Sequence, residues 1–182
     1  MAEEIDACSV AHGAAPAPVP ASSPVSVPAG SGRALVAVFA SPVSGYLLRY
    51  AADAGYRTML VEPDAARADA ARMAGFPVLS AVPEDLEGAD VVVTDHHRDE
   101  LGTALRDALA TKARWIGIMG NPRHAGPHVA ALESLGVAPG DIARVRRPIG
   151  LNIGSRTPPE IAVSALAGLL ADRNNRPGGF EF

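Results

Sequence analysis

The chain has 182 residues, of which 48% are hydrophobic and 20% charged, and its formal net charge is −4. This length predicts one folded domain with a flanking segment, and the hydrophobic fraction is large enough for a real core. Because the net charge is negative, no basic field attracts nucleic acid, and a nucleic-acid partner is not expected.

The lack of a targeting signal and the single cysteine predict a protein of a reducing compartment. No apolar run approaches the ~20 residues of a membrane span, and the acidic start at residues 1–6 lacks the features of a secretory or transit signal. Cys8 is the only cysteine, so no internal disulfide can form. We therefore expect a cytoplasmic protein with no membrane partner.

Residues 1–32 are rich in Ala, Pro, Ser and Gly, and prolines at this density block both helix and sheet. This composition predicts a disordered or polyproline-like tail. The folded domain is expected over residues 33–173, followed by a polar, glycine-rich tail at 174–182.

Apolar runs alternate with helical patterns through the predicted domain. Residues 34–40 are continuously apolar between a glycine and a proline, as in a strand buried on both faces of a parallel sheet. Further strands are expected at 57–62, 76–82, 89–94 and 114–119. Helices are expected at about 42–54, 64–74, 101–109, 129–135 and 157–170, with a helical turn at 139–145 and a loop at 147–156 that has room for a short strand. This rhythm predicts an α/β fold of Rossmann type, a doubly wound, mostly parallel sheet with helices on both faces.

The first strand-to-helix turn, Ala40-Ser-Pro-Val-Ser-Gly45, stands where a dinucleotide fingerprint would have three glycines. Only Gly45, the helix-packing glycine, remains. The helix dipole with Ser41 and Ser44 still offers an anion site, and Glu62 lies about 20 residues on, where a ribose-binding acid belongs. A scaffold turn without nucleotide is the alternative interpretation.

Polar clusters follow two later strands. Asp95 and His96 follow the fourth strand and are candidates for polar contacts to a ligand; metal binding and a solvated strand end are the alternatives, and His124 and His128 could converge with them in space. After the fifth strand, the free amides of the turn at Gly120 and Asn121, together with Arg123, suit an anion such as phosphate. An ordinary glycine turn with an exposed arginine explains the same residues.

The segment Asn152-Ile-Gly-Ser-Arg-Thr157 leads into the last helix. Thr157 and Glu160 form a predicted capping box. Asn152, Gly154 and Arg156 are then candidates for binding an anion at the helix N-terminus. The sequence holds no Gly-x-Ser-x-Gly elbow, no Walker loop and no cysteine outside the tail, which argues against a catalytic role.

Two motifs resemble the C-terminal Rossmann domain of the XdhC/CoxI family of xanthine dehydrogenase accessory factors: Trp115-Ile-Gly-Ile-Met-Gly120 and Pro148-Ile-Gly-Leu-Asn-Ile-Gly-Ser-Arg-Thr-Pro-Pro-Glu-Ile-Ala-Val-Ser164. The resemblance covers about residues 34–173. It implies a maturation factor that binds the molybdenum cofactor (molybdopterin), assists its sulfuration or insertion, and docks on the apoenzyme of a molybdenum hydroxylase. The positions that match the family motifs are Gly117, Gly120, Arg123, Gly150, Asn152, Gly154, Arg156 and Thr157.

The chain departs from the family pattern at several of these points. The first turn lacks the family's Gly-Ala-Gly-His-Val-Gly, Asn121 and Pro122 stand where Ser-Arg is usual, and Asn152 stands where Asp is usual. The N-terminal domain of the family is also absent from the sequence. This suggests either a stand-alone paralogue that works with a separate partner chain, which supplies that domain, or a paralogue with an altered choice of ligand. A homodimer is left open. An NAD(P)-binding Rossmann oxidoreductase remains the alternative function, and a structural or regulatory Rossmann module with an empty site is the third.

Overall fold

The computed structural model describes residues 33–120 and 126–179. Six parallel strands form one sheet in the order β3-β2-β1-β4-β5-β6, which is the Rossmann order. The predicted α/β fold is thus confirmed. The strands are β1 Ala34–Val38, β2 Arg57–Val61, β3 Val78–Leu79, β4 Asp90–Val93, β5 Trp115–Ile118 and β6 Val145–Arg146.

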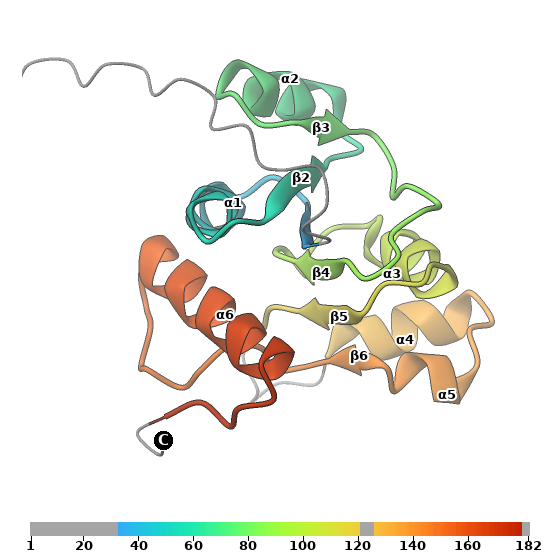
Figure 1. Ribbon diagram of the computed structural model, residues 1–182. Coiled ribbons are helices and arrows are strands. Elements are labelled where there is room, and N and C mark those ends of the chain that lie inside the picture. Colours follow the sequence, from blue (N-terminus) through green and yellow to red (C-terminus); the bar gives the residue numbers. More distant parts are fainter. Residues whose placement is uncertain (1–32, 121–125, 180–182) are drawn as a thin grey trace, which may run out of the picture.

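Helices cover both faces of the sheet (Figure 1). They are α1 Pro42–Asp53, α2 Ala65–Met73, α3 Leu101–Ala110, α4 Pro127–Ser134, α5 Pro139–Ile142 and α6 Pro158–Arg173. One apolar cluster joins α3 and α4 to one face, and a second joins α1 and α6 to the other. No helix in the described part of the chain is long and apolar enough to cross a membrane.

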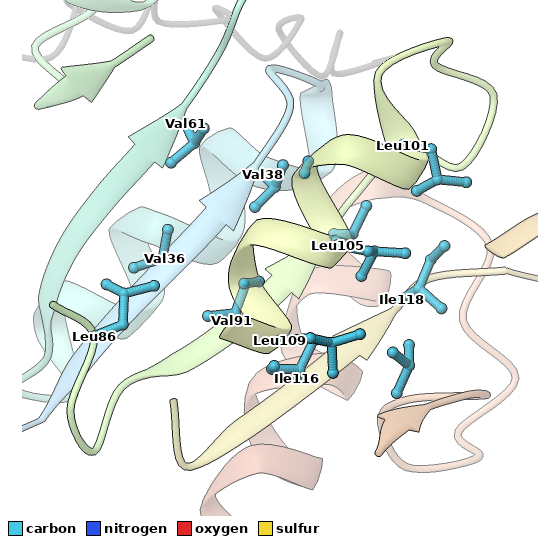
Figure 2. Packing of buried hydrophobic residues seen from close by; sticks show 14 of the residues in the cluster. Val36, Val38, Val61, Leu86, Val91, Leu101, Leu105, Leu109, Ile116 and Ile118 are labelled. Carbon is cyan, nitrogen blue, oxygen red and sulfur yellow. The ribbon is translucent and has the colours of Figure 1, made fainter. Parts of the chain in front are cut away.

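The core on the α3 face shows why the apolar runs form strands. Leu101, Leu105 and Leu109 lie on one side of α3 at four-residue spacing and pack onto strand residues such as Val91 and Ile118 (Figure 2). The central strands β1, β4 and β5 are buried along nearly their whole length. Because both faces are covered, their sequence is continuously apolar rather than alternating.

Two expected elements, one at the C-terminal side and one in the N-terminal half of the domain, need correction. The helical turn expected at 139–145 ends at Ile142, and Val145 and Arg146 form β6, which pairs with β5. A two-residue strand is too short to show a pattern of its own, and its backbone pairing with Ile116 and Gly117 decides it. The third strand is likewise two residues long rather than seven.

Helix α6 runs antiparallel to the strands. Near its last residue, Arg173 donates to Asp90 at the start of β4 over 2.9 Å, and Asp172 pairs with Arg114 directly before β5 at 2.6 Å. The N-terminus of α6 therefore lies at the edge of the sheet where the strands end, which we call the carboxyl edge. The opposite edge, with Asp90, Arg114 and Arg173, is the amino edge.

Candidate functional site

The first turn at the carboxyl edge is closed by its own side chains. Ser41 Oγ accepts from the Ser44 amide over 3.1 Å, and Ser44 Oγ accepts from the Ser41 amide over 2.9 Å, which makes a capping box. Pro42 has no amide to offer. Ser44 is 2% exposed, so the two serines predicted to bind an anion are engaged with the helix end itself, and Gly45 packs in the first turn of α1.

Glu62, the predicted ribose-binding acid, is completely buried. Its two carboxylate oxygens accept from both terminal nitrogens of Arg98, at 3.0 and 3.2 Å. They also accept from the Ala40 amide at 2.7 Å and the Asp64 amide at 2.9 Å. Burial alone would raise the pKa of Glu62, but these hydrogen bonds outweigh it and lower that pKa. A ribose hydroxyl would have to displace Arg98 to reach this carboxylate.

The crevice between β1 and β4 is bridged as well. Thr94 Oγ1 donates toward the Phe39 carbonyl at 2.8 Å and accepts from Ser41 Oγ at 3.2 Å. Phe39 has a φ of 73°, which is rare for a bulky residue, and the Arg98 guanidinium lies 4.8 Å from the centre of its ring. In a Rossmann fold the ligand binds at this switch point, and here Ser41, Thr94 and Arg98 make these contacts with one another and with Phe39 beside it.

Beside this crevice lie imidazoles from the segments after β4 and β5 and an arginine, Arg147, that follows β6. His96 stacks on His97 with ring centres 4.0 Å apart, and the His97 amide donates to Asp95 Oδ1 at 3.0 Å. Burial, then the charges of His97 and Arg147, lower the pKa of His96. The His96 imidazole is therefore harder to protonate than an exposed one.

His128 and Arg147 meet next to the two glycines that flank the β5–α4 connection. A Cβ on Gly120 would lie 2.8 Å from Arg147 Nε, and a Cβ on Gly126 would lie 2.4 Å from the His128 ring. His128 is 7% exposed, and burial followed by the charge of Arg147 lowers its pKa. The absence of a side chain at both glycines therefore lets Arg147 approach the backbone at Gly120 and His128 approach it at Gly126. The candidates Asn121 and Arg123, and His124, lie outside the described residues.

The loop before α6 is held by a glycine contact. Gly150 has a φ of +88°, and a Cβ there would lie 2.6 Å from Ser164 Oγ. Gly168 opposes it, since its own Cβ would come 2.7 Å from the Gly150 Cα. The Pro-Ile-Gly-Leu motif thus packs this loop directly onto α6. Asn152 and Gly154 remain exposed on the outer part of the loop.

The predicted capping box at Thr157 and Glu160 is present. The Glu160 carboxylate accepts from the amides of Arg156 and Thr157 at 2.8 and 3.0 Å, and these bonds lower the pKa of Glu160. The Arg156 side chain is exposed at the carboxyl edge, where an anion could reach it.

The structure thus brings Ser41, Glu62, Asp95, His96, Gly120 and Arg156 to one edge of the sheet, as the strand order requires. Sequence reasoning missed Arg98 and Arg147. Arg98 lies within the polar run at residues 95–100 that follows β4, and this position was the one signal in the sequence that could have found it. Nothing near Arg147 in the sequence points to Gly120. No group of three metal-binding side chains occurs within 33–120 and 126–179.

This strand order, with polar loops at the carboxyl edge and a switch point between β1 and β4, defines a Rossmann-type domain. The family model of the XdhC Rossmann domain matches residues 35–169. The chain therefore belongs to the XdhC Rossmann domain family.

Proteins similar to the chain include one from Escherichia coli and one from Bacillus halodurans. The uncharacterized protein YqeB of Escherichia coli (strain K12) is 37% identical over 89 residues, a match of 49% of this chain and 16% of YqeB. A crystal structure of a xanthine dehydrogenase from Bacillus halodurans is similar with a TM-score of 0.61 and 21% identity, over 79% of this chain and 44% of that one. The second likeness concerns the fold. The matches span less than half the length of either protein.

Proposed function

We propose that this domain acts in an accessory factor for a molybdenum hydroxylase, of the xanthine dehydrogenase or CO dehydrogenase type, and that it binds the molybdenum cofactor. The observation that carries the proposal is membership of the XdhC Rossmann domain family over residues 35–169. The cofactor is cargo here, to be held and handed on rather than used in a reaction of the domain.

The chemistry of the carboxyl edge supports an anionic cargo. The pterin of this cofactor carries a phosphate. Arg156 is exposed at the start of α6, whose N-terminal dipole favours negative charge. The positive charge of Arg147 acts on the two nearby imidazoles, and Gly154 keeps the adjoining loop open, with no atom within 4 Å of a Cβ placed there. These features suit a phosphate-bearing ligand.

The same edge offers little to a nicotinamide dinucleotide, the alternative ligand. Pyrophosphate needs free amides at the first turn, whereas Ser41 and Ser44 occupy that helix end and Pro42 has no amide. The ribose needs a free acid, and Glu62 is paired with Arg98. An NAD(P)-dependent oxidoreductase would therefore require this turn to rearrange.

Titration of the purified protein with the molybdenum cofactor, beside titrations with NAD and NADP, tests the proposal. We expect the cofactor alone to bind. Arg156→Ala should weaken it about tenfold, because a charge-assisted hydrogen bond contributes roughly 1.5–3 kcal/mol. Arg106→Ala, an exposed arginine on α3, is the matched control. Equal affinity in both variants would remove the assignment of Arg156, and binding of NAD or NADP alone would replace the function.

Delivery to a client is the second part of the proposal. We expect the cofactor-loaded protein to activate the cofactor-free apoenzyme of a molybdenum hydroxylase, and to do so faster than an equal amount of free cofactor. A separate chain that carries the family's N-terminal domain is a further partner to include in this assay. If neither mixture gains activity beyond free cofactor, the domain binds but does not deliver.

A further inference from the structure

A groove of about 390 Å³ lies between α1 and α2 and extends to the first turn, Ala40 to Gly45, at one end. We call it the α1–α2 groove. Its apolar lining comes from Leu48 and Leu60, which face the α1 side of the sheet, and from Ala71 of α2. Phe76, which follows α2, and Tyr46 of α1 add aromatic rings. Its volume is within the range of pockets that hold small molecules, ~300–1,000 Å³.

Two arginines without a carboxylate partner line this groove. Arg49 lies with its guanidinium carbon 5.4 Å from the Phe76 ring centre and 5.9 Å from that of Tyr46. Arg67 projects from the first turn of α2. Neither forms an ion pair with any residue in the described ranges, whereas Arg72, one turn further along α2, pairs with Asp69 at 2.7 Å. In a chain of net charge −4, unpaired cations beside a hollow favour an anionic ligand.

The aromatic rings and the two arginines of the groove together indicate which class of ligand it could bind. Aromatic rings and a stacked guanidinium bind flat π-systems, while a second guanidinium pairs with phosphate or carboxylate. The N-terminus of α1 also lies at the groove through Ser41 and Pro42, and its dipole adds positive potential. A small anion alone would make no contact with the apolar lining, and an uncharged ring would form no ion pair with Arg67.

We propose that the α1–α2 groove binds a flat heterocycle that carries a phosphate. The phosphorylated pterin of the molybdenum cofactor is such a molecule, so its placement here rests on the proposed function, and for that ligand the groove is an alternative to the position of the phosphate at Arg156. A purine mononucleotide shares the same chemistry. In either case Phe76 stacks on the heterocycle, Arg67 pairs with the phosphate, and Arg49 contacts both the ring and the anion.

Calorimetric titrations of the full chain test this site, with GMP, guanosine, inorganic phosphate and the molybdenum cofactor as probes. We expect a phosphorylated heterocycle to bind at least about tenfold more tightly than guanosine or phosphate. Arg67→Gln should weaken it about tenfold, and Arg72→Gln, which removes the same charge from the same helix outside the groove, should leave it unchanged. Ala70→Phe, which fills the groove from exposed α2, should abolish binding while the protein stays folded by circular dichroism.

The outcomes separate this site from the proposed function. Cofactor binding that is equal in Arg67→Gln and Arg72→Gln but weaker in Arg156→Ala overturns the groove and leaves the function in place. GMP binding that depends on Arg67, without any cofactor binding, supports the groove and overturns the function. If no probe distinguishes Arg67→Gln from Arg72→Gln, the inference is wrong.

Discussion

The two edges of the sheet use charge in different ways. At the amino edge, fully buried Asp90 accepts from Arg114 at 2.7 Å and from Arg173 at 2.9 Å, and Asp172 takes a further nitrogen of Arg114 at 2.6 Å. This network joins β4, the start of β5 and the end of α6. Each charge faces an opposite one, so the amino edge fastens α6 to the sheet.

The carboxyl edge also has a buried pair, Glu62 with Arg98, but beside it lie imidazoles that can take up a proton and an arginine that is open to solvent. His96 and His128 both have pKa values lowered by burial and by Arg147. Arg156 is exposed. The comparison shows that charged residues have two roles in this domain. At the amino edge they are paired and buried, and they stabilise the fold. At the carboxyl edge the imidazoles and the exposed Arg156 are available to a ligand.

The largest expected effect of a single change is at the amino edge. Asp90→Asn removes the buried charge shared by Arg114 and Arg173, and breaking such a network costs about 3 kcal/mol of unfolding free energy. Urea denaturation measures this loss. Asp107→Asn, which breaks the exposed pair with Arg106, is the control and should change stability by less than about 1 kcal/mol. A similar small change in both variants would mean that the amino edge does not fasten α6.

A glycine at the carboxyl edge should come next. Gly150→Ala places a Cβ 2.6 Å from Ser164 Oγ and 2.9 Å from the Ser164 backbone, at a φ of +88°. We expect a loss of about 2–3 kcal/mol, from strain and overpacking together. Gly136→Ala has a φ of +74° but open space around its Cβ, so it should lose only about 1 kcal/mol. If both variants lost the same unfolding free energy, the clash of the new Cβ with α6 would add nothing to the cost of a positive φ.

The smallest effect is a pH dependence at the carboxyl edge. Burial, followed by the charge of Arg147, lowers the pKa of His128 below its usual 6.5, so below about pH 6.5 the unfolded chain takes up a proton that the native state resists. Stability is therefore full above this pH and falls on acidification. His128→Phe should flatten part of this fall in denaturation series between pH 7.5 and 5, and His96 should account for a remainder. An unchanged slope in the variant would contradict the buried, neutral state of His128.

Much of the fold could be predicted because its signals are local. The run at residues 34–40, the capping serine before Pro42 and the box at Thr157–Glu160 all act within a few residues, and the structure has a strand, a capped helix and a capping box there. The predicted strand β3 was too long and β6 was not recognised, because both are short pieces at the sheet margins. Their length depends on which backbone groups a neighbouring strand can pair.

The site was predicted to the level of the edge but not of the contacts. The parallel strand order places all loops that follow the strands together, so Ser41, Asp95 and Gly120 were expected at one edge. That Glu62 would bind Arg98 could not be predicted, since 36 residues separate them and either could equally have faced solvent or ligand. The position of Arg147 next to Gly120 could not be predicted for the same reason, because the two residues are also far apart in the sequence.

The sequence by itself therefore determined the class of fold, the ends of its main helices and the family, since periodicity, caps and long motifs are properties of neighbouring residues. Tertiary structure decided what the charged groups do. It paired Asp90 and Glu62 inside the protein and brought Gly150 into contact with α6. It also placed Arg49 and Arg67 at the α1–α2 groove, where neither forms an ion pair with a residue that the structure describes. The physical reason is that burial and the distance between charges depend on how distant segments pack, and this packing sets the electrostatic cost of every ionised group.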